Sequence, residues 1–158
     1  MLSGGDMIVG LYNLPQVEIS KTIRIKRAFV GDKEEILEFV KKNFKKNWVY
    51  EVEHALMEPV SKCYIATEDG EILGFACFDS SAKGFFGPIG VDPARRGEDI
   101  GKMLLVKTLE SMREYGYGYA IIGWVSEAEQ FYKKTVGAEY LKDGNPENSV
   151  YSNLVFMD

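Results

Sequence analysis

The segment between residues 91 and 105 holds the residues best suited to chemistry in this 158-residue chain. It reads Val-Asp-Pro-Ala-Arg-Arg-Gly-Glu-Asp-Ile-Gly-Lys-Met-Leu-Leu, with a strand pattern before it and a helical pattern after it. The first turn of a helix leaves backbone amides unpaired and carries partial positive charge, so such a junction attracts anions. Gly97 and Gly101 let a phosphate approach the backbone, and Arg95, Arg96 and Lys102 add positive charge. The segment therefore predicts a phosphate site, with an ordinary solvated turn as the alternative.

Two common nucleotide-binding motifs do not fit this segment. A Walker loop has four residues between its glycines and a Ser or Thr after its lysine. Here three residues separate Gly97 from Gly101, and Met103 follows Lys102. The three spaced glycines of a dinucleotide-binding fingerprint are also missing.

The elements that must position this segment follow from hydrophobic periodicity. Strands are predicted at about residues 22–28, 62–67, 72–78, 84–91 and 119–125, with two more near residue 140 and over residues 150–156. Helices are predicted at about residues 32–44, 49–57, 100–115 and 126–136. This order predicts an α/β (α+β) fold: a mixed, mostly antiparallel sheet of about six to seven strands, flanked by about four helices.

Four local signals set the ends of these elements. Asp32 with Glu35 predicts a capping box at the start of the first helix. Asp69-Gly70 favours a tight turn with positive φ between two hairpin strands. Gly87-Pro88 predicts a bulge or a sheet edge, because proline cannot donate a ladder hydrogen bond. Gly137 is expected to follow the end of the last helix.

Length and composition favour one domain over residues 1–158. Apolar residues make up 46% of the chain, which is enough for a hydrophobic core. Residues 1–20 are expected to form an N-terminal extension, in which residues 7–14 have a weak strand pattern. The net charge of −5 argues against non-specific binding to nucleic acids, which requires a surplus of basic charge.

The chain is expected to be cytoplasmic and to have no contact with a membrane. Its longest uncharged apolar run, residues 116–125, has 10 residues, whereas a spanning helix needs about 20. The first fifteen residues contain Asp6 and no Lys or Arg, unlike the basic start of a signal peptide. Cys63 and Cys77 are too few for a secreted disulfide framework.

The pattern Val91-x-Pro93-x-x-Arg96-Gly97-x-x-Ile100-Gly101-Lys102-x-Leu104-Leu105 resembles the acyl-CoA-binding motif of the GNAT superfamily of N-acetyltransferases. A strand ending at Val125, followed by Ala128-x-x-Phe131-Tyr132-x-Lys134-x-x-Gly137-Ala138, resembles the next strand and helix of that family. The resemblance extends over about residues 22–157 and implies a GNAT-like fold. It implies direct transfer of an acetyl group from acetyl-CoA to a primary amine of a small molecule or peptide, without a metal. A homodimer is also compatible with the resemblance.

The resemblance implies roles for individual residues. The backbone of Ile89 and Val91 would pair with the pantetheine arm of CoA, and an amide within residues 88–90 would hydrogen-bond the thioester oxygen. Tyr132 would protonate the departing thiolate as the general acid, with core packing of the ring as the alternative. The backbone amides of seven residues would hold the CoA pyrophosphate: Arg96, Gly97, Glu98, Asp99, Ile100, Gly101 and Lys102.

Two positions depart from the family pattern. Asp99 stands where the family usually has Gly, and a carboxylate ~4 Å from a pyrophosphate charge would repel it by ~1–4 kcal/mol. We therefore expect the Asp99 side chain to turn away, either to cap the helix or to pair with Arg95. Val125 stands where many members have Asn. These departures motivate one alternative, a non-catalytic acyl-CoA-binding or regulatory module; a structural or interaction protein with an unrelated ligand is another.

The sequence leaves the general base open. Asp79, Glu127 and Glu129 are candidates, with a surface charge as the alternative for each. A nucleophilic couple of His54 with Cys63 or Cys77 is a further alternative, although both cysteines lie in apolar strand patterns typical of core residues.

The acceptor pocket is expected near the second predicted helix, as the resemblance implies. The residues in that region are Trp48, Tyr50, Glu51, Glu53 and His54. If Glu51 and Glu53 line the pocket, a cationic acceptor is favoured; the alternative is a solvated helix face.

Overall fold

The computed structural model describes residues 3–155 as a mixed sheet of seven strands with four α-helices. The strands are β1 (Gly5–Gly10), β2 (Arg24–Arg27), β3 (Cys63–Glu68), β4 (Glu71–Phe78), β5 (Phe85–Val91), β6 (Tyr119–Val125) and β7 (Glu139–Tyr140). The helices are α1 (Lys33–Asn43), α2 (Lys46–Leu56), α3 (Ile100–Tyr115) and α4 (Glu129–Val136). The strand order is β2-β3-β4-β5-β6-β1-β7, antiparallel throughout except for the parallel pair β5 and β6. The predicted fold class is confirmed.

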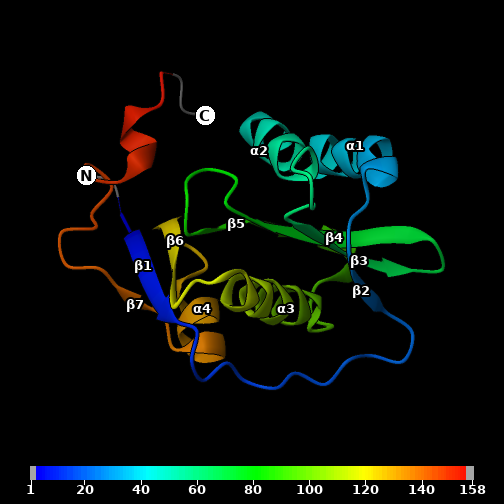
Figure 1. Ribbon diagram of the computed structural model, residues 1–158, viewed down its shortest axis with the longest axis horizontal. Helices are drawn as coiled ribbons and strands as arrows, with labels where there is room; N and C mark the ends of the chain where they lie inside the picture. Colours follow the sequence, from blue (N-terminus) through cyan, green and yellow to red (C-terminus); the bar gives the residue numbers. More distant parts are fainter. Residues whose placement is uncertain (1–2, 156–158) are drawn as a thin grey trace.

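The central strands separate two hydrophobic cores. Helices α1 and α2 cover one face of the sheet, and α3 and α4 cover the other (Figure 1). Successive side chains of a strand point to opposite faces. Cys63 and Ile65 of β3 accordingly pack in the core under α1 and α2, whereas Tyr64 and Ala66 pack in the core with α3. Both faces of this sheet are therefore buried, which fixes its register against a one-residue slip.

Several predicted boundaries and turns are confirmed. Helix α3 and strand β6 begin and end at the residues expected from their apolar spacing. Asp69 and Gly70 adopt φ values of 51° and 81° in the hairpin turn, and Gly137 follows α4 with φ 68°. The pairs Ala76↔Ile89 and Phe78↔Phe86 leave Gly87 and Pro88 opposite a single residue of β4, so the predicted bulge is present.

The predicted capping box at the start of α1 is wrong. Asp32 stands at the N-cap position, but its side chain makes no hydrogen bond to the helix. Its Oδ2 instead accepts hydrogen bonds from the Phe29 amide at 3.0 Å and from Lys26 Nζ at 2.9 Å. The carboxylate thus closes the 3-10 turn Val30–Asp32 that precedes the helix.

The strand predicted at the C-terminal end is wrong, whereas the weak N-terminal strand pattern does correspond to a strand, with different bounds. The strand expected over residues 150–156 is a 3-10 helix, Val150–Asn153, capped by the Ser149 hydroxyl; residue 156 lies outside the described residues. The N-terminal strand is β1 and lies inside the sheet, between β6 and β7. Helix α2 begins three residues before, and α4 three residues after, their predicted starts.

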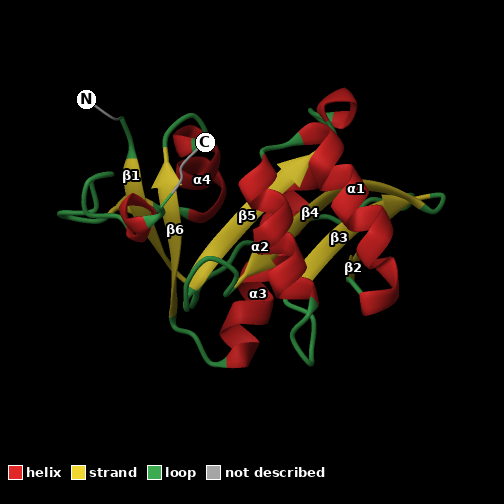
Figure 2. Cartoon of the chain, turned by 90° about the horizontal axis from the view of Figure 1, so that it is seen from above, coloured by secondary structure: helices red, strands yellow, loops and turns green. Residues whose placement is uncertain are grey.

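The parallel pairing of β5 with β6 ends soon after it starts. It joins Phe85 to Ile121 and Phe86 to Ile122, and no later pair is found in the described sheet. Beyond these pairs the two strands diverge toward their C-terminal ends (Figure 2). The bulge at Gly87-Pro88 bends β5, and Trp124 adopts a left-handed φ of 45° near the end of β6. Among residues 3–155, no helix combines the length and the apolar character needed to cross a bilayer.

Candidate functional site

A cleft of about 660 Å³ opens where β5 and β6 diverge. The middle of β5 forms one wall and the end of β6 another, and α2 and the C-terminal 3-10 helix contribute side chains above them. Its lining residues include Trp48, Glu51, Ile89, Trp124, Tyr132 and Tyr151.

The backbone of β5 offers hydrogen-bonding groups to the divergence. The Asp92 amide donates to the Leu73 carbonyl of β4 at 2.8 Å. Because successive amides of a strand point to opposite sides, the amides of Val91 and Ile89 point away from β4. They therefore face the side on which β6 diverges from β5. Pairing of these two residues with the pantetheine arm requires this orientation.

Residues 96–102 form a collar of backbone amides at the start of α3, which we call the amide collar. Gly97 and Asp99 adopt left-handed φ values of 88° and 61°, and Met103 is the first amide bonded in the helix, to the Asp99 carbonyl. Within the described chain, no amide of residues 96–102 donates a hydrogen bond to a protein acceptor. The collar thus has the unpaired donors and the dipole of a helix N-terminus.

Ion pairs arrange the charges around the amide collar. Arg95 binds Glu98 at 2.7 Å and Glu68 at 2.9 Å, and the hydrogen bond from Arg95 lowers the pKa of the Glu98 carboxyl. The expectation that Asp99 pairs with Arg95 or caps α3 is wrong, since Glu98 takes Arg95 and the Asp99 side chain makes no capping bond. Between residues 3 and 155, no carboxylate forms an ion pair with Arg96 or Lys102.

Tyr132 lies on α4 and lines the cleft while being 6% exposed. Burial, followed by the nearby Tyr151, raises the pKa of its phenol well above the ordinary value. Its ring packs edge-on against Phe86, with ring centroids 6.2 Å apart. The position of Tyr132 is compatible with both sequence interpretations, general acid and core packing, because its ring lies in the core and also reaches the cleft. No hydrogen bond to its hydroxyl is found among the residues that the structure describes.

The three carboxylates predicted as candidate bases lie in different places. Glu127 lines the cleft. Glu129 binds Lys133 at 2.8 Å and accepts a hydrogen bond from the Tyr140 hydroxyl at 2.7 Å, so it belongs to the surface of α4. Asp79 lies between β4 and β5 in a buried network away from the lining of the cleft.

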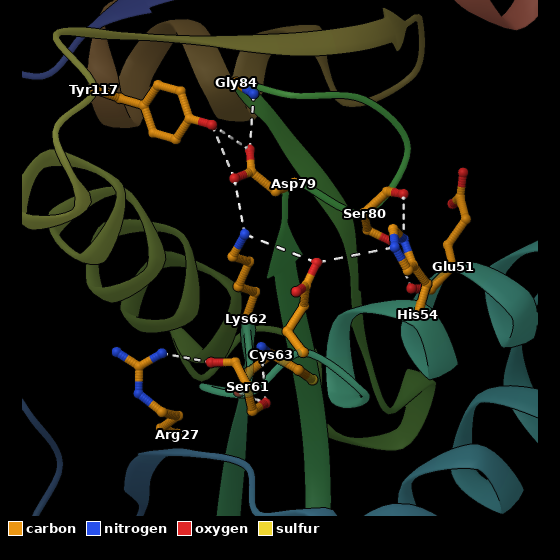
Figure 3. A network of polar contacts seen from close by, with 11 residues as sticks. Arg27, Glu51, His54, Ser61, Lys62, Cys63, Asp79, Ser80, Gly84 and Tyr117 are labelled. Atoms are coloured by element: carbon orange, nitrogen blue, oxygen red, sulfur yellow. Dashed lines mark hydrogen bonds and ion pairs between the residues drawn. The ribbon is translucent and has the colours of Figure 1, made fainter.

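Figure 3 shows the network around Asp79, whose side chain is 6% exposed. It binds Lys62 at 3.2 Å and accepts hydrogen bonds from the Tyr117 hydroxyl and the Gly84 amide. Burial alone would lower the pKa of Lys62, but the hydrogen bond to Asp79 raises it above its ordinary value. Asp79 therefore ties the loop between β4 and β5 to the core, and this loop carries Ser81 to the Glu51 carboxylate.

The predicted acceptor region divides into two parts. Trp48 and Glu51 line the cleft. Glu53 instead binds Lys33 at 3.1 Å, and Tyr50 is exposed, so neither belongs to the site. His54 contacts the Ser80 carbonyl at 3.0 Å and Glu58 at 3.9 Å, below the loop between β4 and β5.

The alternative of a His-Cys nucleophile is wrong. Cys63 and Cys77 pair directly across β3 and β4, and both are buried and free. Burial raises the pKa of the Cys77 thiol, which keeps it protonated and unreactive. Within residues 3–155, no group of three or more His, Cys, Asp or Glu side chains is placed to bind a metal ion.

Comparison with protein families matches residues 28–138 to the acetyltransferase (GNAT) family. The chain belongs to this family. The matched range includes the amide collar, the cleft-forming strands and Tyr132, so the GNAT resemblance expected from the motifs is confirmed. A search of curated proteins found no match.

Solved structures share this GNAT fold at low sequence identity. A GCN5-related glucosamine N-acetyltransferase region of a fungal multi-domain GH3 beta-N-acetylglucosaminidase gives a TM-score of 0.68 at 15% identity, covering 87% of this chain and 20% of that one. A GCN5-related N-acetyltransferase from Sphaerobacter thermophilus gives 0.68 at 20% identity, covering 85% and 47%. A GNAT family N-acetyltransferase from Escherichia coli in complex with CoA gives 0.52 at 20% identity, covering 65% and 63%. This chain spans less than half the length of the first two.

Replacing Asp79 with Asn tests whether the buried network holds the loop beside the site. The variant leaves the buried Lys62 charge with only its longer pair to Glu58 at 3.9 Å, so we expect the free energy of unfolding to fall by about 3 kcal/mol in urea denaturation. The matched control, Glu129→Gln, removes a more exposed ion pair and should cost less than about 1 kcal/mol. Equal losses in the two variants would contradict the structural role of Asp79.

Proposed function

We propose that this GNAT-family chain transfers an acetyl group from acetyl-CoA to a primary amine by direct attack of the amine. The observation that carries the proposal is the amide collar: its donors are unpaired among the described residues, and only the 3-10 turn Pro93–Arg95 separates it from β5, the strand that has parted from β6. A pyrophosphate is the anion that such a collar suits, because several amides can bind its oxygens at once. The motifs that resemble the family's acyl-CoA site fall on these same residues.

The donor molecule would extend along β5. Its pyrophosphate would sit on the amide collar, and its pantetheine arm would pair with the outward amides of Val91 and Ile89 as an added strand would. The thioester would then reach the cleft, beside the bulge in β5 and close to Tyr132.

Tyr132 would serve as the general acid of the reaction. Its phenol has an ordinary pKa of 10, which burial raises further, so the hydroxyl is protonated at neutral pH. It can therefore donate a hydrogen bond to the departing thiolate and then transfer the proton. The lack of a hydrogen-bond partner for this hydroxyl among the described residues is consistent with a role toward a ligand.

The alternative function, a non-catalytic acyl-CoA-binding or regulatory module, rests on Asp99 and Val125. Asp99 places a carboxylate within the amide collar, and Val125 is buried and offers no polar group. The two functions differ in one observable, since only the enzyme releases free CoA when an amine is added.

Replacing Lys102 with Glu tests the pyrophosphate site. Reversing this charge in the first turn of α3 should weaken binding of acetyl-CoA about tenfold or more, measured by titration calorimetry. Lys107→Glu, an exposed position on the same helix, is the matched control and should bind like the wild type. Equal affinity in the two variants would exclude the amide collar as the phosphate site.

Replacing Tyr132 with Phe tests the general acid. The variant keeps the ring in the core and loses the hydroxyl alone, so turnover should fall about 100-fold while acetyl-CoA affinity and stability stay near wild type. Turnover is followed as thiol release over a panel of amines. An unchanged rate in the variant would remove Tyr132 from the mechanism. If the wild type binds acetyl-CoA tightly but releases no CoA with any amine, the non-catalytic module is favoured.

A further inference from the structure

Glu51 places a carboxylate in the cleft from the middle of α2. Its Oε1 accepts a hydrogen bond of 2.7 Å from the Ser81 hydroxyl, which arrives on the loop between β4 and β5. No Lys, Arg or His forms an ion pair with Glu51 within the part of the chain that the structure describes. Burial raises the pKa of this carboxyl, and the bond from Ser81 acts in the opposite direction. A half-buried carboxylate held in place without a cation is a site that a cation would stabilise.

Large apolar side chains surround this carboxylate. Trp48 lies one helical turn before Glu51 on the same face of α2, and its ring stacks on Phe44 at 5.2 Å and packs edge-on against Phe75 at 6.1 Å. Trp124 and Leu154 contribute further apolar surface to the cleft. A bound molecule therefore meets the anchored carboxylate of Glu51 beside aromatic side chains, and the face of an indole also attracts a cation. Glu127 and Lys45 are the other charged residues that line the cleft.

Tyr151 links the carboxylate to the proposed general acid. Burial raises the pKa of the Tyr151 phenol to about 12, while Ser81 lowers it and the charge of Glu51 raises it by smaller amounts. Tyr151 in turn adds to the burial that raises the pKa of Tyr132. Its ring covers Gly123 of β6 so closely that a Cβ there would lie 2.3 Å from the ring. The 3-10 helix thus brings Tyr151 to the same cleft as Glu51 and Tyr132, so all three residues border one continuous space.

We propose that Glu51 binds the ammonium of the acceptor and takes its first proton, and that the acceptor is a primary amine carried on an apolar, aromatic-sized body. This inference rests on the proposed acetyltransferase function and deepens it. The aromatic walls select the body of the acceptor, and the carboxylate selects its charge. Ser81 is a positioning residue, because it acts only by holding the carboxylate of Glu51.

The proposed step balances in protons and electrons. Glu51 takes one proton from the ammonium, and the lone pair freed on nitrogen forms the C–N bond with the thioester carbonyl carbon. The C–S bond breaks with its electron pair going to sulfur, which takes the proton of Tyr132. The second proton lost by the amide nitrogen restores the phenol, and Glu51 releases its own proton to water.

Binding of amines in the absence of CoA tests Glu51 separately from the donor site. Two probes share one apolar body: 2-phenylethylamine, which is cationic at neutral pH, and 2-phenylethanol, which is neutral. The wild type should bind the amine about tenfold tighter than the alcohol in titration calorimetry, as expected for a charged hydrogen bond. The Glu51→Gln variant keeps the shape of the side chain and its bond from Ser81, and it should bind the two probes alike.

Two variants and a third probe complete the test. Glu53→Gln, two residues along α2 and outside the cleft, should keep the preference of the wild type. Ser81→Ala should reduce the preference without abolishing it, since the carboxylate remains. The dication of 1,4-diaminobutane carries charge without an apolar body and should bind more weakly than 2-phenylethylamine; tighter binding would overturn the proposed acceptor class.

Turnover supplies the second readout. With acetyl-CoA and 2-phenylethylamine, Glu51→Gln should lower kcat about 100-fold and raise the KM for the amine, while the affinity for acetyl-CoA stays unchanged. An undiminished preference for the amine in the Gln variant would overturn the role of Glu51, even with the donor site intact. If the wild type does not bind acetyl-CoA, the proposed function is refuted, whatever the result with the amines.

Discussion

The ladder between β5 and β6 stops after two residue pairs, and the rest of the site depends on this interruption. In a continuous parallel ladder, the outward amides of β5 would bond to β6 and no ligand could reach them. The bulge at Gly87-Pro88 and the left-handed Trp124 turn the strands apart instead. Backbone donors, normally used within the sheet, are thereby left for another molecule.

The same divergence sets the order of groups along the site. Strand β5 runs toward the amide collar at one end and borders the cleft along its middle. A long donor with a phosphate end and a reactive end fits such an arrangement, since one end binds charge and the other reaches the cleft. The buried network of Asp79, Lys62 and Tyr117 then holds the loop that carries Ser81 to Glu51.

Local signals were sufficient to predict α3, β6 and the hairpin turn. The start of α3 follows a short turn in which Gly97 and Asp99 adopt positive φ, and the Asp69-Gly70 turn also needs positive φ, so neighbouring residues determine both. The ends of the chain were harder because their structure comes from distant partners. Strand β1 is stabilised by β6, more than 100 residues later, and the C-terminal 3-10 helix packs Tyr151 against that same β6. The weak strand pattern of residues 7–14 does not reveal that β1 lies inside the sheet, and the pattern of residues 150–156 predicted a strand where a 3-10 helix forms.

The functional side chains show the same limit. Glu51 and Glu53 flank the buried Val52 at about 100° to either side of the helix, so periodicity alone cannot decide which of them faces the cleft. The placement of α2 over the sheet brings Glu51 to the cleft, whereas Glu53, on the other side of the helix, binds Lys33. Asp79 is a candidate base by its residue type, but in the structure its carboxylate binds Lys62 and Tyr117 and stabilises the fold. Lys62 comes just before β3 and Tyr117 just after α3, and no local motif connects either of them to Asp79.

A titration of the ¹⁵N-labelled protein with acetyl-CoA, followed by the backbone amide resonances, tests the central claim most directly. Binding at the amide collar predicts that the largest shifts fall on residues 96–102, with further shifts at Ile89 and Val91. Saturable binding that leaves these resonances unmoved, or no binding at all, would contradict the account.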